Sequence, residues 1–328
     1  MKMSLKKMSL KIILGLLMFA AGCADVPCGA IKVASYNIRL SGKDGNADRG
    51  TPNVWKERKD DLLALVKKLD LDVFGLQEVC PDQVRFLREN LPGYEFVGEH
   101  RNADRKTGEA SPVCYRKSRF EALSKGTFWL SETPDTPGLK GWGAACPRVC
   151  SYLILRDRST GKKFCFANAH TDHISALARR NGMLLVIERM KKFGAGVPIV
   201  FTGDHNCRET EEPAMAVKEH LKDALYISEK PPKGSWRTFS GWCWRDQEVS
   251  VMEALQASQE LRNAKNGSPD SMKGAKGLHP YEKYGARIDY IYVSEGIRVI
   301  DYKTVNDARP GKKLYPSDHF PVVATIEL

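Results

Sequence analysis

The segment Ser317-Asp318-His319-Phe320, close to the C-terminal end, brings an acid and a histidine to the start of an apolar run. It is one of several places where polar side chains stand at the end of a segment whose composition predicts burial. The others are residues 35–39, 76–79, 203–206 and 288–292. Polar groups at the ends of buried strands cost free energy unless they are paired or bound to something. Several such ends converging on one point would make a metal and phosphate site.

The bulk composition is that of a globular protein. The chain has 328 residues, of which 42% are hydrophobic and 28% charged. It has no heptad pattern, no repeat of solenoid period and no long linker rich in Pro, Gly or Ser, which argues against coiled coils and repeat proteins. The formal charge of +11 favours polyanionic partners such as nucleic acid, phosphorylated metabolites or anionic lipid, without choosing among them.

The N-terminus is predicted to be a targeting segment. A stretch with four lysines precedes an apolar run over residues 12–21 that is too short for a stable membrane span. Because Cys23 directly follows small residues, we expect residues 1–22 to be a lipoprotein signal peptide and residues 23–30 a short tether. The protein would be exported and anchored to a bacterial membrane through lipidated Cys23, in the periplasm or at the cell surface. An ordinary secretory peptide is the alternative. Either cleavage would lower the formal charge from +11 to +7.

Residues 31–328 are predicted to form one α/β domain, because strand-like and helix-like segments alternate along them. The clearest are two amphipathic helices and two buried strands: residues 55–69, 176–193, 71–76 and 197–203. The short strand-like runs between residues 94 and 169 are closely spaced, which predicts antiparallel neighbours. A polar stretch near residues 245–282 interrupts the pattern and is predicted to be a surface insertion, part helix and part loop.

A divalent metal site is predicted around Glu78. This residue follows an apolar run, so its carboxylate should emerge at the end of a buried strand. Mg²⁺ takes a few oxygen ligands and keeps several waters, a demand that Glu78 meets with help from Asn37 and Asp318. Mg²⁺ or Mn²⁺ suits these residues better than zinc, since no cluster of His and Cys ligands is visible. A surface charge at a strand end is the alternative for Glu78.

Asp204 is the predicted base. It stands where another apolar run leaves the core, and Asn206 lies two residues on and so on the same side. A carboxylate held by an amide is suited to orienting and deprotonating water, an assistance worth about 10²–10⁴-fold in rate. The alternative is a simple turn, because Gly203-Asp204-His205-Asn206 is also good loop composition.

Two histidines at strand ends are predicted to contact phosphate. A carboxylate behind an imidazole fixes its tautomer and supports its charged form, and Asp289 is placed to do this for His319. An imidazolium facing phosphate would stabilise charge in the transition state. His170 is the second candidate, and a structural histidine is the alternative for each.

Other side chains carry a weaker signal. Four of them suit either a phosphate contact or plain structural pairing: Tyr115, Arg148, Asp172 and His173. Four tryptophans lie outside the periodic segments, where they would stack on bases or sugars or else close a core: Trp142, Trp236, Trp242 and Trp244.

Taken in order, these motifs resemble the endonuclease/exonuclease/phosphatase superfamily, in particular its bacterial secreted or lipoprotein members. The resemblance covers nearly all of the chain after Ile31 and rests on six motifs in the family's order. It implies an α/β fold, a four-layer sandwich of two mixed β-sheets flanked by α-helices. The implied metal ligands are Asn37, Glu78 and Asp318. Asp204 would orient or deprotonate the attacking water, with Asn206 beside it. His170 and His319 would contact the phosphate, and Asp289 would support His319.

The resemblance implies a metal-dependent phosphoric ester hydrolase that acts by in-line attack of water. We expect a nuclease or other phosphodiesterase slightly ahead of a phosphomonoesterase. The alternatives are sphingomyelinase-like activity, inositol-phosphate phosphatase activity, or non-catalytic binding of a polyanion on the same fold. The expected partners are a phosphoester substrate, with nucleic acid one candidate, and the membrane; no protein partner is predicted. His205 departs from the family pattern, which usually has an apolar residue there.

Overall fold

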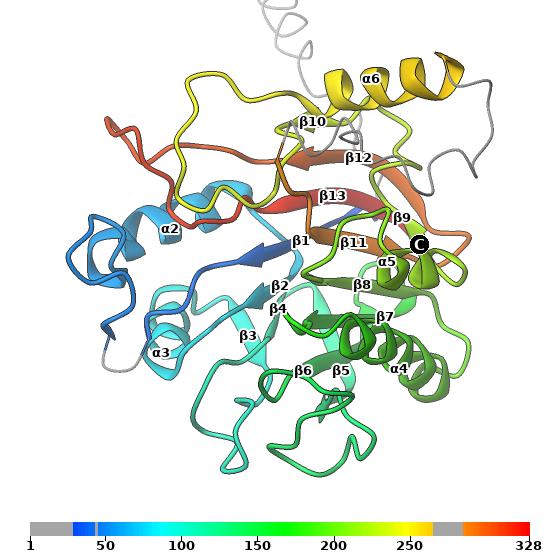
Figure 1. Cartoon of the computed structure of the whole chain (residues 1–328). Coiled ribbons are helices and arrows are strands. Elements are labelled where there is room, and N and C mark those ends of the chain that lie inside the picture. Colours follow the sequence, from blue (N-terminus) through cyan, green and yellow to red (C-terminus); the bar gives the residue numbers. More distant parts are fainter. Residues whose placement is uncertain (1–28, 43–44, 265–284) are drawn as a thin grey trace, which may run out of the picture.

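The computed structural model describes residues 29–42, 45–264 and 285–328. Two mixed β-sheets stack face to face, and helices cover their outer faces (Figure 1). The predicted four-layer α/β sandwich is therefore confirmed. The predicted signal peptide, most of the tether and residues 265–284 of the predicted insertion lie outside the described residues.

The first sheet has seven strands, and its centre is the parallel pair of β1 and β2. In spatial order the strands are β10 (Lys233–Gly234), β12 (Arg298–Thr304), β13 (Val322–Glu327), β1 (Ile31–Asn37), β2 (Val73–Gln77), β4 (Val113–Arg116) and β3 (Tyr94–Val97). The second sheet has six strands, with the parallel pair of β7 and β8 at its centre. Their order is β5 (Phe120–Trp129), β6 (Val149–Asp157), β7 (Lys163–His170), β8 (Ile199–Asp204), β11 (Asp289–Val293) and β9 (Lys222–Asp223).

The helices pack their apolar faces on the two sheets. The first sheet is covered by α2 (Trp55–Leu69) and α3 (Pro81–Asn90), and the second by α4 (Ala176–Gly194) and α5 (Glu212–Lys218). The fifth helix of the described chain, α6 (Val251–Ala264), lies beside β10 and forms part of the predicted insertion. Among the helices of the described residues, none combines the length and apolar character needed to cross a bilayer.

Alternation along the central strands decides which side chains face the other sheet. On β8, Val200 packs between the sheets, whereas Phe201 packs in the outer layer beneath α4. Burial of each such side chain contributes about 1.5–3 kcal/mol, so the register is strongly specified. Because successive side chains alternate, Thr202 and Asp204 continue the inner face that Val200 begins.

The same alternation brings polar residues of five strands to one end of the space between the sheets. Asn37 pairs with Gln77 in the β1–β2 register, and Asp204 pairs with both His170 and Asp289 in the second sheet. These side chains therefore meet without any long loop having to position them.

Polar contacts tie the two sheets together just below this end. Gln77 Nε2 donates to Ser35 Oγ at 3.0 Å and to Asn168 Oδ1 at 2.6 Å, and Asn168 Nδ2 donates to the Leu76 carbonyl at 2.8 Å. Gly75 makes room for this network, because a Cβ there would lie 2.2 Å from Asn168 Oδ1. The network fixes the relative position of the sheets at the site.

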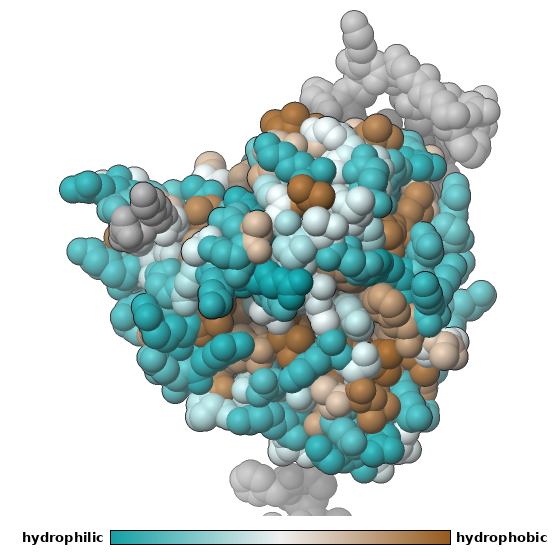
Figure 2. Space-filling view, turned by 90° about the horizontal axis from the view of Figure 1, so that it is seen from below, coloured by the Kyte–Doolittle hydropathy of each residue, from teal (hydrophilic) through white to brown (hydrophobic). Residues whose placement is uncertain are grey.

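One strand of the first sheet is missing from the sequence prediction. Strand β12 is not predicted, because a register shift between Val299 and Asp301 breaks its alternation of apolar and polar residues. All seven cysteines of the described residues are free, including Cys146 and Cys150. The face shown in Figure 2 is largely hydrophilic, with its apolar residues in separate patches.

Candidate active site

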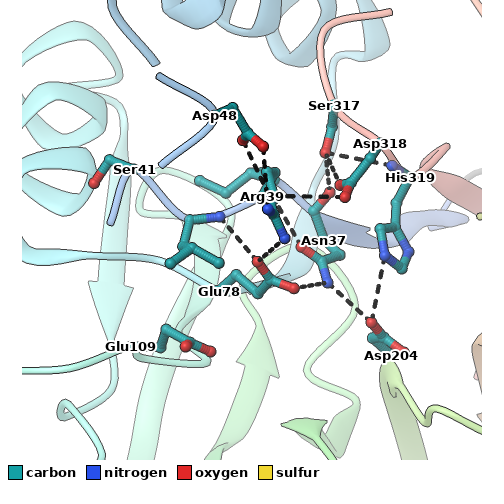
Figure 3. A network of polar contacts seen from close by, with 12 residues as sticks. Asn37, Arg39, Ser41, Asp48, Glu78, Glu109, Asp204, Ser317, Asp318 and His319 are labelled. Atoms are coloured by element: carbon teal, nitrogen blue, oxygen red, sulfur yellow. Dashed lines mark hydrogen bonds and ion pairs between the residues drawn. The ribbon is translucent and has the colours of Figure 1, made fainter. Parts of the chain in front are cut away.

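The structure brings all eight predicted site residues to the same end of the stacked sheets. Three of them lie on adjacent strands of the second sheet, and Asn37 reaches them from the end of β1. Asn37 Nδ2 donates to Glu78 Oε1 at 3.0 Å and to Asp204 Oδ2 at 2.9 Å, so one amide bridges the two sheets (Figure 3).

Glu78 is held by its backbone as well as by its carboxylate. Its φ of 62° is left-handed, a conformation that costs a non-glycine residue about 1–3 kcal/mol and is common at functional sites. The Leu40 amide donates to Glu78 Oε2 at 2.9 Å. The strained turn after β2 thus aims this carboxylate at Asn37 and Asp204.

Asp204 lies at the centre of the site and is almost fully buried. Its Oδ2 is 3.5 Å from His170 Nε2 and 3.6 Å from His319 Nε2, and its Oδ1 accepts from the Asn206 amide at 3.0 Å. Burial raises the pKa of Asp204 to about 7, against the attraction of His319. A carboxyl group with that pKa is suited to accept a proton near neutral pH.

His319 and Asp289 form a buried ion pair. His319 Nδ1 lies 2.9 Å from Asp289 Oδ2, which leaves Nε2 facing Asp204. Burial alone would lower the pKa of His319, but the carboxylates of Asp289 and Asp204 outweigh it and raise this pKa to about 10. His319 is therefore an imidazolium at neutral pH.

His170 has the opposite character. Burial, followed by the charge of Arg148, lowers the pKa of His170 well below its usual value. Its Nε2 lies 2.9 Å from Asn206 Nδ2, which also donates to the Thr171 carbonyl, so His170 Nε2 accepts and the proton is on Nδ1. The site thus holds one charged and one neutral histidine on opposite sides of Asp204.

Asp318 completes the acidic group. Ser317 Oγ donates to the Asn37 carbonyl at 2.8 Å, which anchors the segment 317–320 to the end of β1. Burial raises the pKa of Asp318, and the charge of Glu78 adds to this effect. Arg39 Nε lies 3.8 Å from Asp318 Oδ2.

The donor set fits a hard divalent cation. The carboxylate of Glu78 lies near those of Asp204 and Asp318, and burial disfavours the negative charge of the two aspartates, so a cation there would stabilise it. Asn37 donates from its amide NH₂ to Glu78 and Asp204, while its Oδ1 accepts from the Arg39 backbone at 2.9 Å. Its predicted role as a direct ligand would use the second lone pair of Oδ1 and stays a prediction.

Two charged residues near the site are not predicted from the sequence. Arg39 contacts Glu78 and Asp318, although the segment around it is noticed only for Asn37. Glu109 Oε2 lies 3.8 Å from His170 Nδ1 and 3.7 Å from Arg148. Glu109 comes from an irregular loop, so no strand-end signal marks it.

The weaker candidates are found in different places. Arg148 lies beside the site and contacts His173 Nδ1 at 3.1 Å. Asp172 accepts from the amides of Ile174 and Ser175 and so supports the start of α4. Tyr115 pairs with Val73 at the beginning of β2, the end opposite Glu78, and takes no part in the site.

His205 packs in the core behind the site. Its ring stacks on Tyr290 and Tyr292, each with centroids 5.6 Å apart, and it touches Phe201. Burial lowers the pKa of His205 to about 3, so this side chain is neutral and substitutes for an apolar residue.

Comparison with known proteins supports the resemblance. Residues 34–319 match the Endonuclease/Exonuclease/phosphatase family. The chain belongs to this family. It is similar to the mannosyl-6-phosphatase Bt3783 of Bacteroides thetaiotaomicron, with 32% identity and a TM-score of 0.72, covering 91% of this chain and 100% of that one. An endonuclease/exonuclease/phosphatase protein of Bacteroides vulgatus is 29% identical with a TM-score of 0.73, over 92% and 100% of the two chains.

Curated relatives match over a smaller share of their own length. Nocturnin of Drosophila melanogaster is 23% identical over 313 residues, which cover 84% of this chain and 42% of nocturnin. The chain spans 29–59% of the length of the curated relatives that it matches. The family and the buried site together identify the chain as a metal-dependent phosphoesterase.

Proposed function

We propose that the protein hydrolyses a phosphomonoester of a small metabolite, with a sugar phosphate as the leading candidate. The observation that carries this proposal is the convergence of His170 and His319 on Asp204 at 3.5 and 3.6 Å, with one imidazole neutral and the other charged. The sequence alone ranks phosphodiesters slightly ahead. The likeness to a mannosyl-6-phosphatase over that enzyme's whole length favours a monoester instead.

The divalent cation would be held by Glu78 and Asp318, with Asn37 as a further ligand. When bound, Mg²⁺ or Mn²⁺ would polarise the phosphoryl oxygens and neutralise their charge. The carboxylates supply the oxygen donors that these ions prefer.

Asp204 would orient the attacking water and accept its proton. The water oxygen forms a bond to phosphorus in line with the leaving ester oxygen, whose bond to phosphorus breaks. The position of Asp204 is fixed by the amide groups of Asn37 and Asn206. Such positioning is a large part of the rate gain in phosphoryl transfer.

His319 would donate from Nε2 to a phosphoryl oxygen and stabilise the charge that builds up there. Asp289 would hold its ring and its charged state through the 2.9 Å contact at Nδ1. Asn206 would bind the same phosphate from the other side by turning an Nδ2 hydrogen from His170 Nε2 to a phosphoryl oxygen. His170 would contact that phosphate with its proton moved from Nδ1 to Nε2.

Hydrolysis of a phosphodiester, including a nucleic acid, is the second candidate. The formal charge, +11 for the full chain and +7 without residues 1–22, favours it because positive charge attracts polyanions. Sphingomyelin, a phosphodiester, and inositol phosphates, which are phosphomonoesters, are further candidate substrates.

A substrate panel tests the proposal. We expect hexose 6-phosphates and p-nitrophenyl phosphate to be hydrolysed with Mg²⁺ or Mn²⁺ faster than DNA, RNA, sphingomyelin or a nitrophenyl phosphodiester. His319→Ala should abolish turnover, while His220→Ala, a change at an exposed histidine, should leave it intact. A wild-type preference for diesters would reject the monoester proposal, and full activity of His319→Ala with its fold retained would reject the site.

We also propose that Cys23 carries a lipid anchor after removal of residues 1–22, because small residues precede it directly. The full chain expressed in bacteria should fractionate with membranes, and mass spectrometry should find acyl groups on Cys23. The Cys23→Ser variant should be released from the membrane fraction. An unmodified Cys23, or cleavage elsewhere, would contradict the anchor.

A further inference from the structure

Arg39 is a charged side chain of the site to which the proposed mechanism gives no role. It lies between Asp48 on one side and the carboxylates of Glu78 and Asp318 on the other (Figure 3). We propose that Arg39 binds a non-bridging oxygen of the substrate phosphate, and that Asp48 positions its guanidinium so that doubly charged phosphomonoesters are favoured over phosphodiesters. This inference rests on the proposed function of the site.

The backbone of Arg39 is fixed more firmly than a surface loop requires. Its amide donates to Asn37 Oδ1 at 2.9 Å, and its carbonyl accepts from Arg58 at 2.7 Å and from Gln83 Nε2 at 2.8 Å. Arg58 is fully buried and also donates to the carbonyls of Ile38 and Asn53. These hydrogen bonds therefore fix the position of the Arg39 backbone relative to the end of β1.

Strained backbone marks the same network. Nine non-glycine residues of the described chain have a positive φ, and four of them belong to this site. These are Arg39 at 56°, Asp48 at 60°, Glu78 at 62° and Asn206 at 47°. Such conformations persist only where surrounding contacts impose them, and they concentrate at functional sites.

The guanidinium is pre-oriented with donors to spare. Its Nε and NH2 groups donate to the two oxygens of Asp48, each at 3.1 Å. Its NH1 group lies 3.9 Å from Glu78 Oε2, too far for a hydrogen bond, and finds no acceptor among the residues that the structure describes. The side chain is 31% exposed, so an anion approaching the acidic group from solvent meets this free donor.

The charge of the substrate explains what such a donor would select. Near pH 7 a phosphomonoester carries about −1.5 to −2 charges, because its second pKa is about 6. A phosphodiester has one fewer ionisable oxygen and carries a single charge. An arginine held in a fixed geometry therefore gains more from the monoester, to which one charge-assisted hydrogen bond is worth about 10- to 100-fold in affinity.

A purely structural Arg39 is the competing account. In that case its charge would only offset the repulsion among Glu78, Asp318 and Asp48. Removing it would then disturb metal binding or folding and would slow monoester and diester hydrolysis to the same extent. The two accounts thus differ in the ratio of the two activities.

The experiment compares p-nitrophenyl phosphate with bis(p-nitrophenyl) phosphate, which share a leaving group. We expect Arg39→Gln to lower kcat/KM for the monoester by about 10- to 100-fold and for the diester by less than about 5-fold. Asp48→Asn should shift the ratio in the same direction by less, and Arg298→Gln, at an exposed ion pair far from the site, should not change it. Equal losses on both substrates would overturn the proposal.

A binding measurement separates this inference from the proposed function. Calorimetry of the metal-loaded protein with inorganic phosphate needs no turnover, and Arg39→Gln should weaken phosphate binding by about 10-fold or more. The affinity for Mg²⁺ should not fall, since a neighbouring positive charge is removed. If the wild type prefers diesters but phosphate binding still depends on Arg39, the proposed function fails and Arg39 keeps its role as a phosphate-binding residue. Phosphate binding that is unchanged in Arg39→Gln would refute the inference itself.

Discussion

Replacing Asp289 with asparagine removes one charge and almost no volume from the site. The ion pair between His319 Nδ1 and Asp289 Oδ2 is 2.9 Å long, and Asp289 is fully buried. The substitution keeps the shape of the side chain while ending its support for the imidazolium. Asp289→Asn therefore tests whether the charge on His319 matters for catalysis.

The size of the effect follows from this one contact. A hydrogen bond to a charged group contributes about 1.5–3 kcal/mol, and a pKa difference of one corresponds to about 1.4 kcal/mol. The pKa of His319, raised to about 10 in the native protein, should therefore fall by about 1–2 in Asp289→Asn. The loss of ring orientation should lower kcat by about 10-fold at pH 7, where most of His319 remains protonated.

The assay is the pH dependence of kcat on p-nitrophenyl phosphate, together with NMR titration of His319. We expect the alkaline limb of the profile and the NMR pKa to move down together. Thermal unfolding of the variant monitors the fold. If the alkaline limb stays in place and kcat changes by less than about 2-fold in a folded variant, Asp289 does not act through the charge of His319.

Three further predictions concern the same residues. In the wild type, kcat/KM should rise with pH up to about 7, because Asp204 must lose its proton to act as a base. It should fall above about 10 as His319 loses its proton. A bound cation lowers the pKa of Asp204 and so moves the acid limb of the profile to lower pH. Glu78→Gln should weaken Mg²⁺ binding in calorimetry by at least about 10-fold. Gly75→Ala should lower the free energy of unfolding in urea by about 1–3 kcal/mol, because its Cβ would lie 2.2 Å from Asn168 Oδ1.

Each of these has a contrary result. A flat pH profile between 6 and 8 with no metal-dependent shift would remove Asp204 as the base. For Glu78, the matched control is Glu219→Gln, at an exposed position, and equal affinities in the two variants would mean that Glu78 is not a ligand. For Gly75, the contrary result is a stability equal to that of the wild type.

The layers and the convergence of the site could be predicted from the sequence because both depend on short apolar runs with polar ends. The run that ends at Glu78 and the run that ends at Asp204 are buried along their whole length, so the polar residue that closes each run is readable without coordinates. Helix α2 is predicted with the bounds that the structure has, since its apolar stripe is regular.

Other parts of the site could not be read in this way. Glu109 reaches His170 from a loop without periodicity, and the pairing of Arg39 with Asp48 depends on two left-handed turns that no glycine marks. The division of His170 and His319 into a neutral and a charged ring arises from burial and from Asp289, which only the three-dimensional neighbours define. For Tyr115 the sequence leaves a phosphate contact and plain packing open, because a strand pattern does not say which end of the sheet a residue reaches; the structure places it at the end opposite Glu78.

One cation is predicted to lie beside Asp204 and His319, held by Glu78, Asp318 and Asn37 at the end of the first sheet. Crystals grown with Mn²⁺, measured at a wavelength where manganese scatters anomalously, test it directly. We predict a single strong peak about 2–2.3 Å from a carboxylate oxygen of Glu78, on the side facing Asp318 and Asp204. An anomalous peak elsewhere on the protein, with none near Glu78 at saturating Mn²⁺, would contradict the account.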